Sequence, residues 1–222
     1  MVKNFNQLTV FVIIIFTFFS CNNNSFKLEQ GDLLFQNTGT DAIDNAIKKV
    51  TATALAKNYS HVGMALQENK QWFIIEAIPK KGVCKTPLKV FLNRHKNSSG
   101  NSQTAVARLK KPFQKYIPKA IAYGQQVLNR PYDAIFLWDD NSFYCSELIY
   151  KMFSKQGLPK KSIPFLTHPM TFNDSTGNPL PSWEKYYKVR NQPIPEGMEG
   201  TNPNLMASSK HITFIYDYER PK

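Results

Sequence analysis

Two strand-like runs joined by a short polar turn constrain the fold of this chain more than any other stretch. Residues 60–66 (SHVGMAL) and 71–77 (QWFIIEA) are strand-like runs, and residues 67–70 (QENK) between them are polar. Such a pattern is typical of an antiparallel β-hairpin. The sequence therefore predicts a sheet that contains these two strands side by side.

The register of this hairpin decides which polar side chains meet. If Glu68 and Asn69 form a two-residue loop, His61 lies directly opposite Glu76. Directly opposed residues have Cβ atoms about 4.5–5.5 Å apart on one face of the sheet. A register shift by one residue would move Glu76 to the other face. The predicted histidine–carboxylate pair thus depends on the length of the loop.

A second informative stretch, residues 141–153 (NSFYCSELIYKMF), predicts a helix with Cys145 near its start. Asn141 or Ser142 is expected to cap this helix, and Glu147 places negative charge in its first turns. Apolar residues follow at helical spacing: Leu148, Ile149, Met152 and Phe153. The positive end of a helix dipole favours a reactive thiolate, whereas a cysteine on an apolar face is also an ordinary core residue. Both interpretations of Cys145 remain open at this point.

The rest of the chain predicts one α+β domain over residues 31–222. With 222 residues, of which 42% are hydrophobic and 20% charged, the chain is long and apolar enough to form one ordinary core. Residues 31–36 and 211–218 predict strands, and residues 41–50 and 117–129 predict helices. Residues 160–210 are rich in Pro, Gly, Asn and Ser, which predicts a largely irregular segment that packs on the domain or forms a wall of a cleft.

The N-terminus predicts export rather than folding. Residues 8–19 form an apolar run after Lys3, and the run ends in Ser20 and Cys21. This pattern is similar to a bacterial lipoprotein signal, with residues 1–20 removed, Cys21 lipidated and residues 21–30 acting as a tether. An ordinary secretory signal or an N-terminal anchor is the alternative. The sequence thus predicts a lipid-anchored protein of the cell envelope, on the periplasmic side of a bacterial membrane or at the cell surface.

The charge of the chain points to no particular partner. The formal net charge is +12, but Lys and Arg are scattered without a long basic run. A basic surface of this kind fits a solvated face or weak attraction to an anionic membrane or cell-wall polymer. Because no nucleic-acid-binding motif accompanies the charge, no nucleic-acid partner is expected.

A few further side chains are candidates for weaker roles. Tyr144 is expected to line a cleft or to pack. Asp139 and Asp140 form either a turn before the helix or a negative rim that selects a cationic amine. Cys84 and Cys145 could form a disulfide in an oxidising compartment. The remaining histidines are expected at the surface or in packing: His95, His168 and His211. Because metal-ligand spacing and phosphate loops are missing from the sequence, no metal or cofactor is expected.

Several short motifs, taken in order, carry a family resemblance. They are GDLL at 31–34, SHVGM at 60–64, IEA at 75–77, GV at 82–83, RPYD at 130–133 and FYCSEL at 143–148. In this order the chain resembles the permuted NlpC-type papain-like proteins, specifically the YiiX-like group. His61 precedes Cys145, as in the permuted enzymes and in the lecithin:retinol acyltransferase-like enzymes.

The resemblance implies a small antiparallel sheet packed against the cysteine helix, with Cys145 as nucleophile, His61 as general base and Glu76 orienting the histidine. The chemistry agrees, since a cysteine nucleophile needs a base and the base needs a third group to fix its tautomer. The expected function is a cell-envelope cysteine amidase or peptidase that acts on peptidoglycan-type or short peptides.

Two alternatives to this function remain. The first is a thiol acyltransferase or lipase that acts on lipid esters. The second is an inactive envelope-binding protein, which a disulfide between Cys84 and Cys145, or a register that separates His61 from Glu76, would favour.

Overall fold

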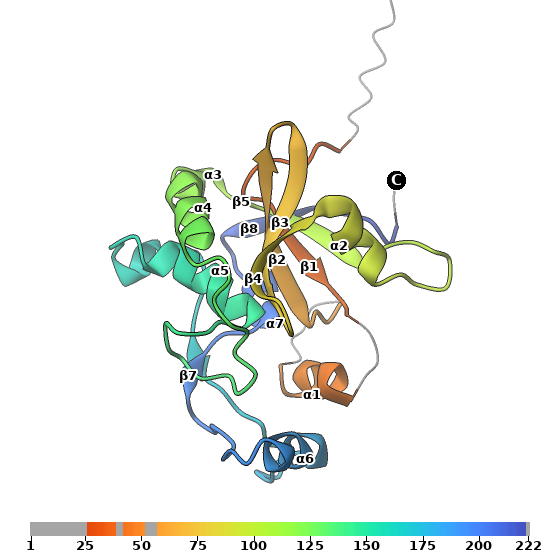
Figure 1. Cartoon of the computed structure of the whole chain (residues 1–222), viewed down its shortest axis with the longest axis vertical. Helices are drawn as coiled ribbons and strands as arrows, with labels where there is room; N and C mark the ends of the chain where they lie inside the picture. Colours follow the sequence, from red (N-terminus) through yellow and green to blue (C-terminus); the bar gives the residue numbers. More distant parts are fainter. Residues whose placement is uncertain (1–25, 39–41, 52–56, 221–222) are drawn as a thin grey trace, which may run out of the picture.

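The protein is built on a twisted antiparallel sheet, which Figure 1 shows at the centre of the molecule. The computed structural model describes residues 26–38, 42–51 and 57–220. Six strands pair in the order β4-β3-β2-β1-β5-β8. Their bounds are β1 Leu33–Gln36, β2 His61–Glu68, β3 Gln71–Ile78, β4 Gly82–Pro87, β5 Thr104–Leu109 and β8 Ile212–Asp217. Every pairing in this sheet is antiparallel, as the sequence predicted.

Helices cover both faces of the sheet. The α-helices of the described residues are α1 Ala42–Val50, α2 Leu88–Arg94, α3 Lys111–Gln114, α4 Ile117–Gln126, α5 Cys145–Ser154, α6 Pro181–Val189 and α7 Pro203–Ala207. Alternate strand residues face opposite sides. On one side Met64 and Ile75 pack in the main core with α4 and α5. On the other side Ala65 and Ile74 pack with Phe91 of α2.

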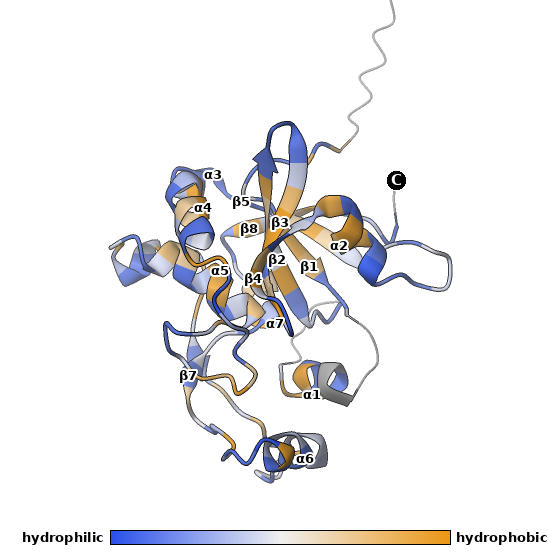
Figure 2. Ribbon diagram, viewed as in Figure 1, coloured by the Kyte–Doolittle hydropathy of each residue, from blue (hydrophilic) through white to orange (hydrophobic). Residues whose placement is uncertain are grey.

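The β2–β3 hairpin corrects the predicted register. Its two-residue loop is Asn69 and Lys70, both with positive φ (48° and 64°), and Glu68 pairs with Gln71. Positive φ at both central residues is the mark of a type I′ turn, whose twist matches that of the flanking strands. The predicted loop was therefore wrong by one position, which shifts the pairing by two residues. The polar tip of this hairpin stands out at the top of Figure 2.

A two-residue shift preserves the face on which each side chain lies, because the side-chain period of a strand is two. Continuing the observed register places Glu76 beside Gly63, and a Cβ built on Gly63 would lie 3.3 Å from the Glu76 Cβ. Glu76 is thus a diagonal neighbour of His61 instead of its direct partner, and the two remain on one face.

The start of α5 also differs from the prediction. The helix begins at Cys145 with Tyr144 as its N-cap, so neither Asn141 nor Ser142 caps it. Instead, the backbone N–H of Tyr144 donates to Glu147 Oε2 at 3.3 Å. This bond ties the first turn of the helix to the residue before it, and it confirms the expected place of Glu147 in that turn.

Residues 160–210 are more regular than predicted. They contain the short helix Lys160–Ser162, the strand pair β6 His168–Pro169 and β7 Glu199–Gly200, and helices α6 and α7. Helix α6 buries Trp183 and Tyr187 in a cluster with Phe172 and with Ala46 of α1. Figure 1 shows α1 and α6 at the lower end of the view, away from the sheet. The aromatic residues explain the helix, which the high Pro and Gly content of this region concealed.

Within the described part of the chain, we find no helix that is both long and apolar enough to cross a bilayer. The predicted signal, residues 1–20, and the predicted lipidation site, Cys21, lie outside the described residues.

Candidate active site

Cys145 occupies the first position of α5. The apolar face of α5 fixes this end of the helix, because Leu148, Ile149 and Met152 are fully buried in the main core. The Cys145 side chain is 7% exposed and its thiol is free, as is that of Cys84. The structure therefore has no disulfide bond between Cys84 and Cys145.

His61 and Glu76 meet beside this thiol. His61 Nε2 lies 2.6 Å from Glu76 Oε2, and both side chains are buried. His61 and Cys145 line the same cavity, and interactions with Cys145 contribute to raising the pKa of His61. Because Nε2 is held by Glu76, Nδ1 is the ring nitrogen left for the thiol. The structure thus brings the three predicted residues together despite the shifted register.

The charges of this group stabilise one another. Burial disfavours a charged His61, but its hydrogen bonds and charge interactions with Cys145 and Glu76 outweigh burial and raise the pKa of His61 to about 9. Burial also opposes ionisation of Glu76, yet its bonds to His61 and Arg94 lower the pKa of Glu76 to about 2. Both shifts favour an imidazolium–carboxylate pair at neutral pH.

Arg94 and Thr86 complete the surroundings of Glu76. Arg94 donates from Nη1 to Oε2 at 3.1 Å and from Nη2 to Oε1 at 2.5 Å, and the Thr86 hydroxyl donates to Oε1. A bidentate guanidinium fixes a carboxylate in orientation as well as in charge. Sequence reasoning missed both residues. The pairing of β3 with β4, followed by the short helix α2, was the signal that could have placed them beside Glu76.

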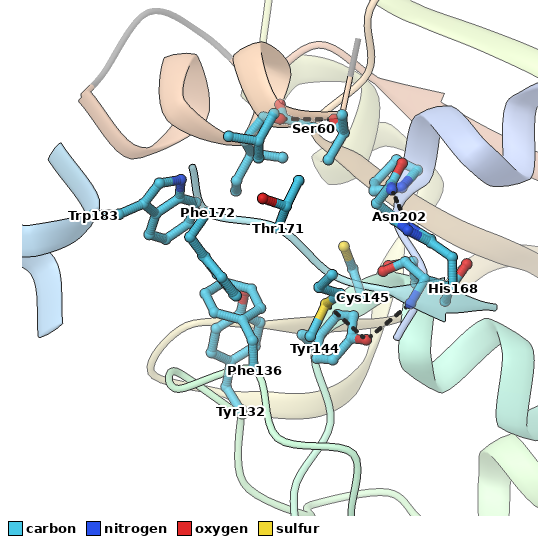
Figure 3. Close-up of a pocket in the computed structure, with 17 residues that line it drawn as sticks. Ser60, Tyr132, Phe136, Tyr144, Cys145, His168, Thr171, Phe172, Trp183 and Asn202 are labelled. Atoms are coloured by element: carbon cyan, nitrogen blue, oxygen red, sulfur yellow. Dashed lines mark hydrogen bonds between the residues drawn. The ribbon is translucent and has the colours of Figure 1, made fainter. Parts of the chain in front are cut away.

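Two cavities meet at Cys145. The smaller, of about 60 Å³, has a mostly apolar lining, and Figure 3 shows Phe136, Phe172 and Trp183 around the space beside the cysteine. The larger, of about 510 Å³, is lined in part by basic side chains, with His61 among them. Residues 168–172 and 201–203 line the smaller cavity, so the 160–210 segment does form a cleft wall.

The comparison with known families decides the class of protein. A family profile described as "Permuted papain-like amidase enzyme, YaeF/YiiX, C92 family" matches residues 27–216. The chain belongs to this family. Its members are papain-like cysteine hydrolases, and the predicted permuted papain-like fold is thereby confirmed.

Two known proteins are similar to this chain. The uncharacterized protein YiiX of Escherichia coli strain K12 is 28% identical over 129 residues, which cover 58% of this chain and 59% of YiiX. The aligned part thus spans about three fifths of that relative. The crystal structure of the metalloprotein yiiX from Escherichia coli O157:H7 matches with a TM-score of 0.69 and 24% identity, over 86% of this chain and 98% of that one. At this identity the second likeness shows the fold alone.

The described residues of this family member hold no cluster of three or more His, Cys, Asp or Glu that could bind a metal ion.

Tyr144 lines the smaller cavity, and its side chain also contacts residues of the cleft wall. Its hydroxyl accepts a bond from the Thr201 backbone N–H at 3.2 Å and lies 3.9 Å from Met170 Sδ. Burial raises the pKa of Tyr144 well above its usual value, so the phenol stays neutral. Tyr144 thus links the start of α5 to the cleft wall.

Asp139 and Asp140 lie at a separate surface hollow, with Lys151 and Lys155. Asp140 pairs with Lys151 at 3.0 Å and with Lys155 at 2.5 Å, and the bond from Lys155 lowers the pKa of Asp140. Asp139 accepts the backbone N–H groups of residues 141 and 142, at 2.8 and 3.2 Å. Because lysines neutralise Asp140 and Asp139 serves the turn, this geometry supports the turn and not the amine-selecting rim.

The three other histidines differ in position. His211 packs on Phe113, with ring centroids 4.4 Å apart, as predicted. His168 lines the smaller cavity and accepts a bond from Asn202 Nδ2 at 3.2 Å, and His95 lines the larger cavity. The sequence gives no local motif for either, because their places depend on the packing of segments far apart in the chain.

Proposed function

We propose that this protein hydrolyses amide bonds of peptide-type substrates, with Cys145 as nucleophile, His61 as general base and acid, and Glu76 as the group that orients His61. One observation carries the proposal. A free cysteine at the first position of α5 shares a cavity with a histidine whose Nε2 lies 2.6 Å from a buried carboxylate. This is the arrangement that nucleophilic cysteine catalysis requires.

The reaction proceeds in two steps. The Cys145 thiolate attacks the amide carbonyl carbon, and the C–N bond breaks as the His61 imidazolium protonates the leaving amine, which leaves a thioester on Cys145. His61 then removes a proton from a water molecule, which attacks the thioester and releases the carboxylic acid and the thiolate. The Cys145 backbone N–H, which has no intrahelical acceptor at this position, is placed to donate to the oxyanion.

The substrates we propose are peptidoglycan-type or short peptides at the cell envelope. The lipoprotein-like N-terminus supports the location, and the peptidase-type family supports the peptide. Mass spectrometry of products from purified peptidoglycan fragments tests this proposal. Wild type and Cys84→Ala are expected to release the same products, and Cys145→Ala none. Equal product release by Cys145→Ala would defeat the proposal.

A lipid-directed activity is the second candidate, and the apolar lining of the smaller cavity favours it. A labelled acyl-enzyme formed from phospholipid but not from peptide would establish a thiol acyltransferase or lipase instead. Two features would have favoured an inactive envelope-binding protein: a disulfide between Cys84 and Cys145, and a separation of His61 from Glu76. Instead, both cysteines are free and His61 contacts Glu76.

A further inference from the structure

The two cavities at Cys145 differ in their relation to His61. Cys145 lines both, whereas His61 is among the described residues that line the larger cavity but not the smaller one. During amide cleavage the proton donor must lie on the side of the leaving amine. If the proposed function holds, the larger cavity therefore receives the amine portion of the substrate, and the smaller, apolar one receives the acyl portion.

Two arginines line the larger cavity, and their surroundings differ. The charge of Arg94 is balanced by Glu76 through the two bonds described above. Arg190, just after α6, is exposed, and the described part of the chain offers it no carboxylate within ion-pair distance. Arg190 is thus a cation at the active-site cavity whose charge is not balanced by a neighbouring side chain.

Arg190 is also held in place. Its Cζ lies 3.4 Å from the centroid of the Tyr186 ring, and its Nη1 donates to the Tyr186 carbonyl oxygen at 2.9 Å. The Tyr186 hydroxyl in turn donates to the Ala134 carbonyl oxygen at 2.7 Å. A guanidinium stacked on a fixed ring is pre-organised, and its remaining N–H groups suit the geometry of a carboxylate.

We propose that Arg190 binds a carboxylate on the amine portion of the substrate. The described residues that line the larger cavity include no acidic side chain, and its volume of about 510 Å³ accommodates an amino acid residue. The preferred amide nitrogen then belongs to an amino acid with a free carboxylate. The carboxylate is either the α-carboxylate of a C-terminal residue or a side-chain carboxylate next to the scissile bond.

Paired ligands test this recognition without requiring turnover. The binding of N-acetyl-alanyl-alanine, of its C-terminal carboxamide and of N-acetyl-alanyl-glutamic acid α-amide, which keeps a free side-chain carboxylate, to Cys145→Ala protein is measured by calorimetry. The acetyl-alanyl part is the same in all three ligands. We expect at least one carboxylate ligand to bind about tenfold more tightly than the uncharged carboxamide, because a charge-assisted bidentate bond is lost in the latter. The two carboxylate ligands distinguish the α-carboxylate from the side-chain carboxylate.

Variants assign the preference to Arg190. In the Cys145→Ala background, Arg190→Gln is expected to abolish the carboxylate preference and Arg190→Lys to retain part of it. Lys188→Gln removes an equal charge from α6 at a residue that does not line the cavity, and it is expected to keep the preference. Failure of all three ligands to bind, equal affinity for them, or a preference that survives Arg190→Gln, would each overturn the proposal.

Turnover of the same ligands by wild-type protein separates this proposal from the proposed function. A carboxylate preference in binding, without hydrolysis that depends on Cys145, would support the Arg190 site and contradict the amidase. Hydrolysis that depends on Cys145 but is equally fast with and without the carboxylate would support the amidase and contradict the Arg190 site.

Discussion

At the scale of residues, the site is a chain of contacts that runs from Cys145 through His61 and Glu76 to Arg94. Burial opposes the charged forms of both His61 and Glu76, and the interactions of each with its neighbours outweigh burial. The physical consequence is that pH controls stability as well as chemistry.

The first prediction concerns this linkage at His61. Its pKa is about 9 in the folded protein against a usual 6.5, so its contribution to stability is fully present below pH 6.5 and is lost as pH rises towards 9. The free energy of unfolding of wild type minus that of His61→Gln should therefore fall by on the order of 3 kcal/mol between pH 6 and pH 9.5. Urea unfolding at both pH values measures it. A difference that is independent of pH would contradict the assigned charge state.

The second prediction concerns Arg94, which donates two hydrogen bonds to Glu76 and which we expect to position that carboxylate. Removing its charge with Arg94→Gln raises the pKa of Glu76 from about 2 and loosens the carboxylate. We expect kcat to fall about tenfold or more, and the acid limb of the rate profile to move to higher pH. Arg94→Lys should restore the acid limb in part. A fall in rate without any shift of the acid limb would indicate a structural role only.

At the scale of elements, the β2–β3 hairpin shows what could and could not be predicted. The runs around residues 67–70 predicted both strands and the meeting of His61 with Glu76. They could not decide between two loops one residue apart, because neither contains the Gly that marks a type I′ turn. His61 and Glu76 meet despite the wrong predicted register, because the pairing moved by two residues and both side chains stayed on one face.

Other elements depended on contacts distant in sequence. The positions of Arg94 and Arg190 follow from the pairing of β3 with β4 and from the packing of α6 on α1. Neither contact is indicated by a pattern in the neighbouring sequence. The helical pattern of α6, PSWEKYYKV, is short and lies among Pro and Gly, so composition suggested an irregular chain.

The hairpin loop gives the third prediction. Lys70 is exposed with a φ of 64°, a conformation that glycine adopts more readily than lysine. Lys70→Gly should therefore stabilise the protein by about 1 kcal/mol and leave activity unchanged. Lys185→Gly, on an exposed position of α6, should destabilise it by about 1 kcal/mol. Chemical denaturation measures both. The same sign for the two substitutions would contradict the turn geometry.

At the scale of the whole molecule, two segments far apart in sequence enclose one site. The sheet with α5 and α2 carries Cys145, His61, Glu76 and Arg94, and the 160–210 segment contributes to the lining of both cavities. The family resemblance predicted the sheet and the cysteine helix. The cavities follow only from the folded chain, because their linings combine residues from many elements.

The fourth prediction concerns the proposed attachment of the molecule to a membrane. If Cys21 is lipidated, the protein expressed in a bacterium should sediment with membranes, and its mature N-terminal peptide should carry a diacylglycerol mass. Cys21→Ala should lose the lipid mass, whereas Cys84→Ala should keep it. Recovery of unmodified mature wild-type protein in the soluble fraction would favour the ordinary secretory signal.

The central claim is that Cys145 is the nucleophile of an amide hydrolase, and its most direct test is a trapped intermediate. Wild-type protein is quenched in acid during turnover of N-acetyl-alanyl-alanine or a peptidoglycan fragment, and its proteolytic peptides are analysed by mass spectrometry. We predict one acyl group in thioester linkage on Cys145, none on Cys84, and none in Cys145→Ala. Acylation of Cys84 in place of Cys145, or undiminished hydrolysis by Cys145→Ala, would contradict the claim.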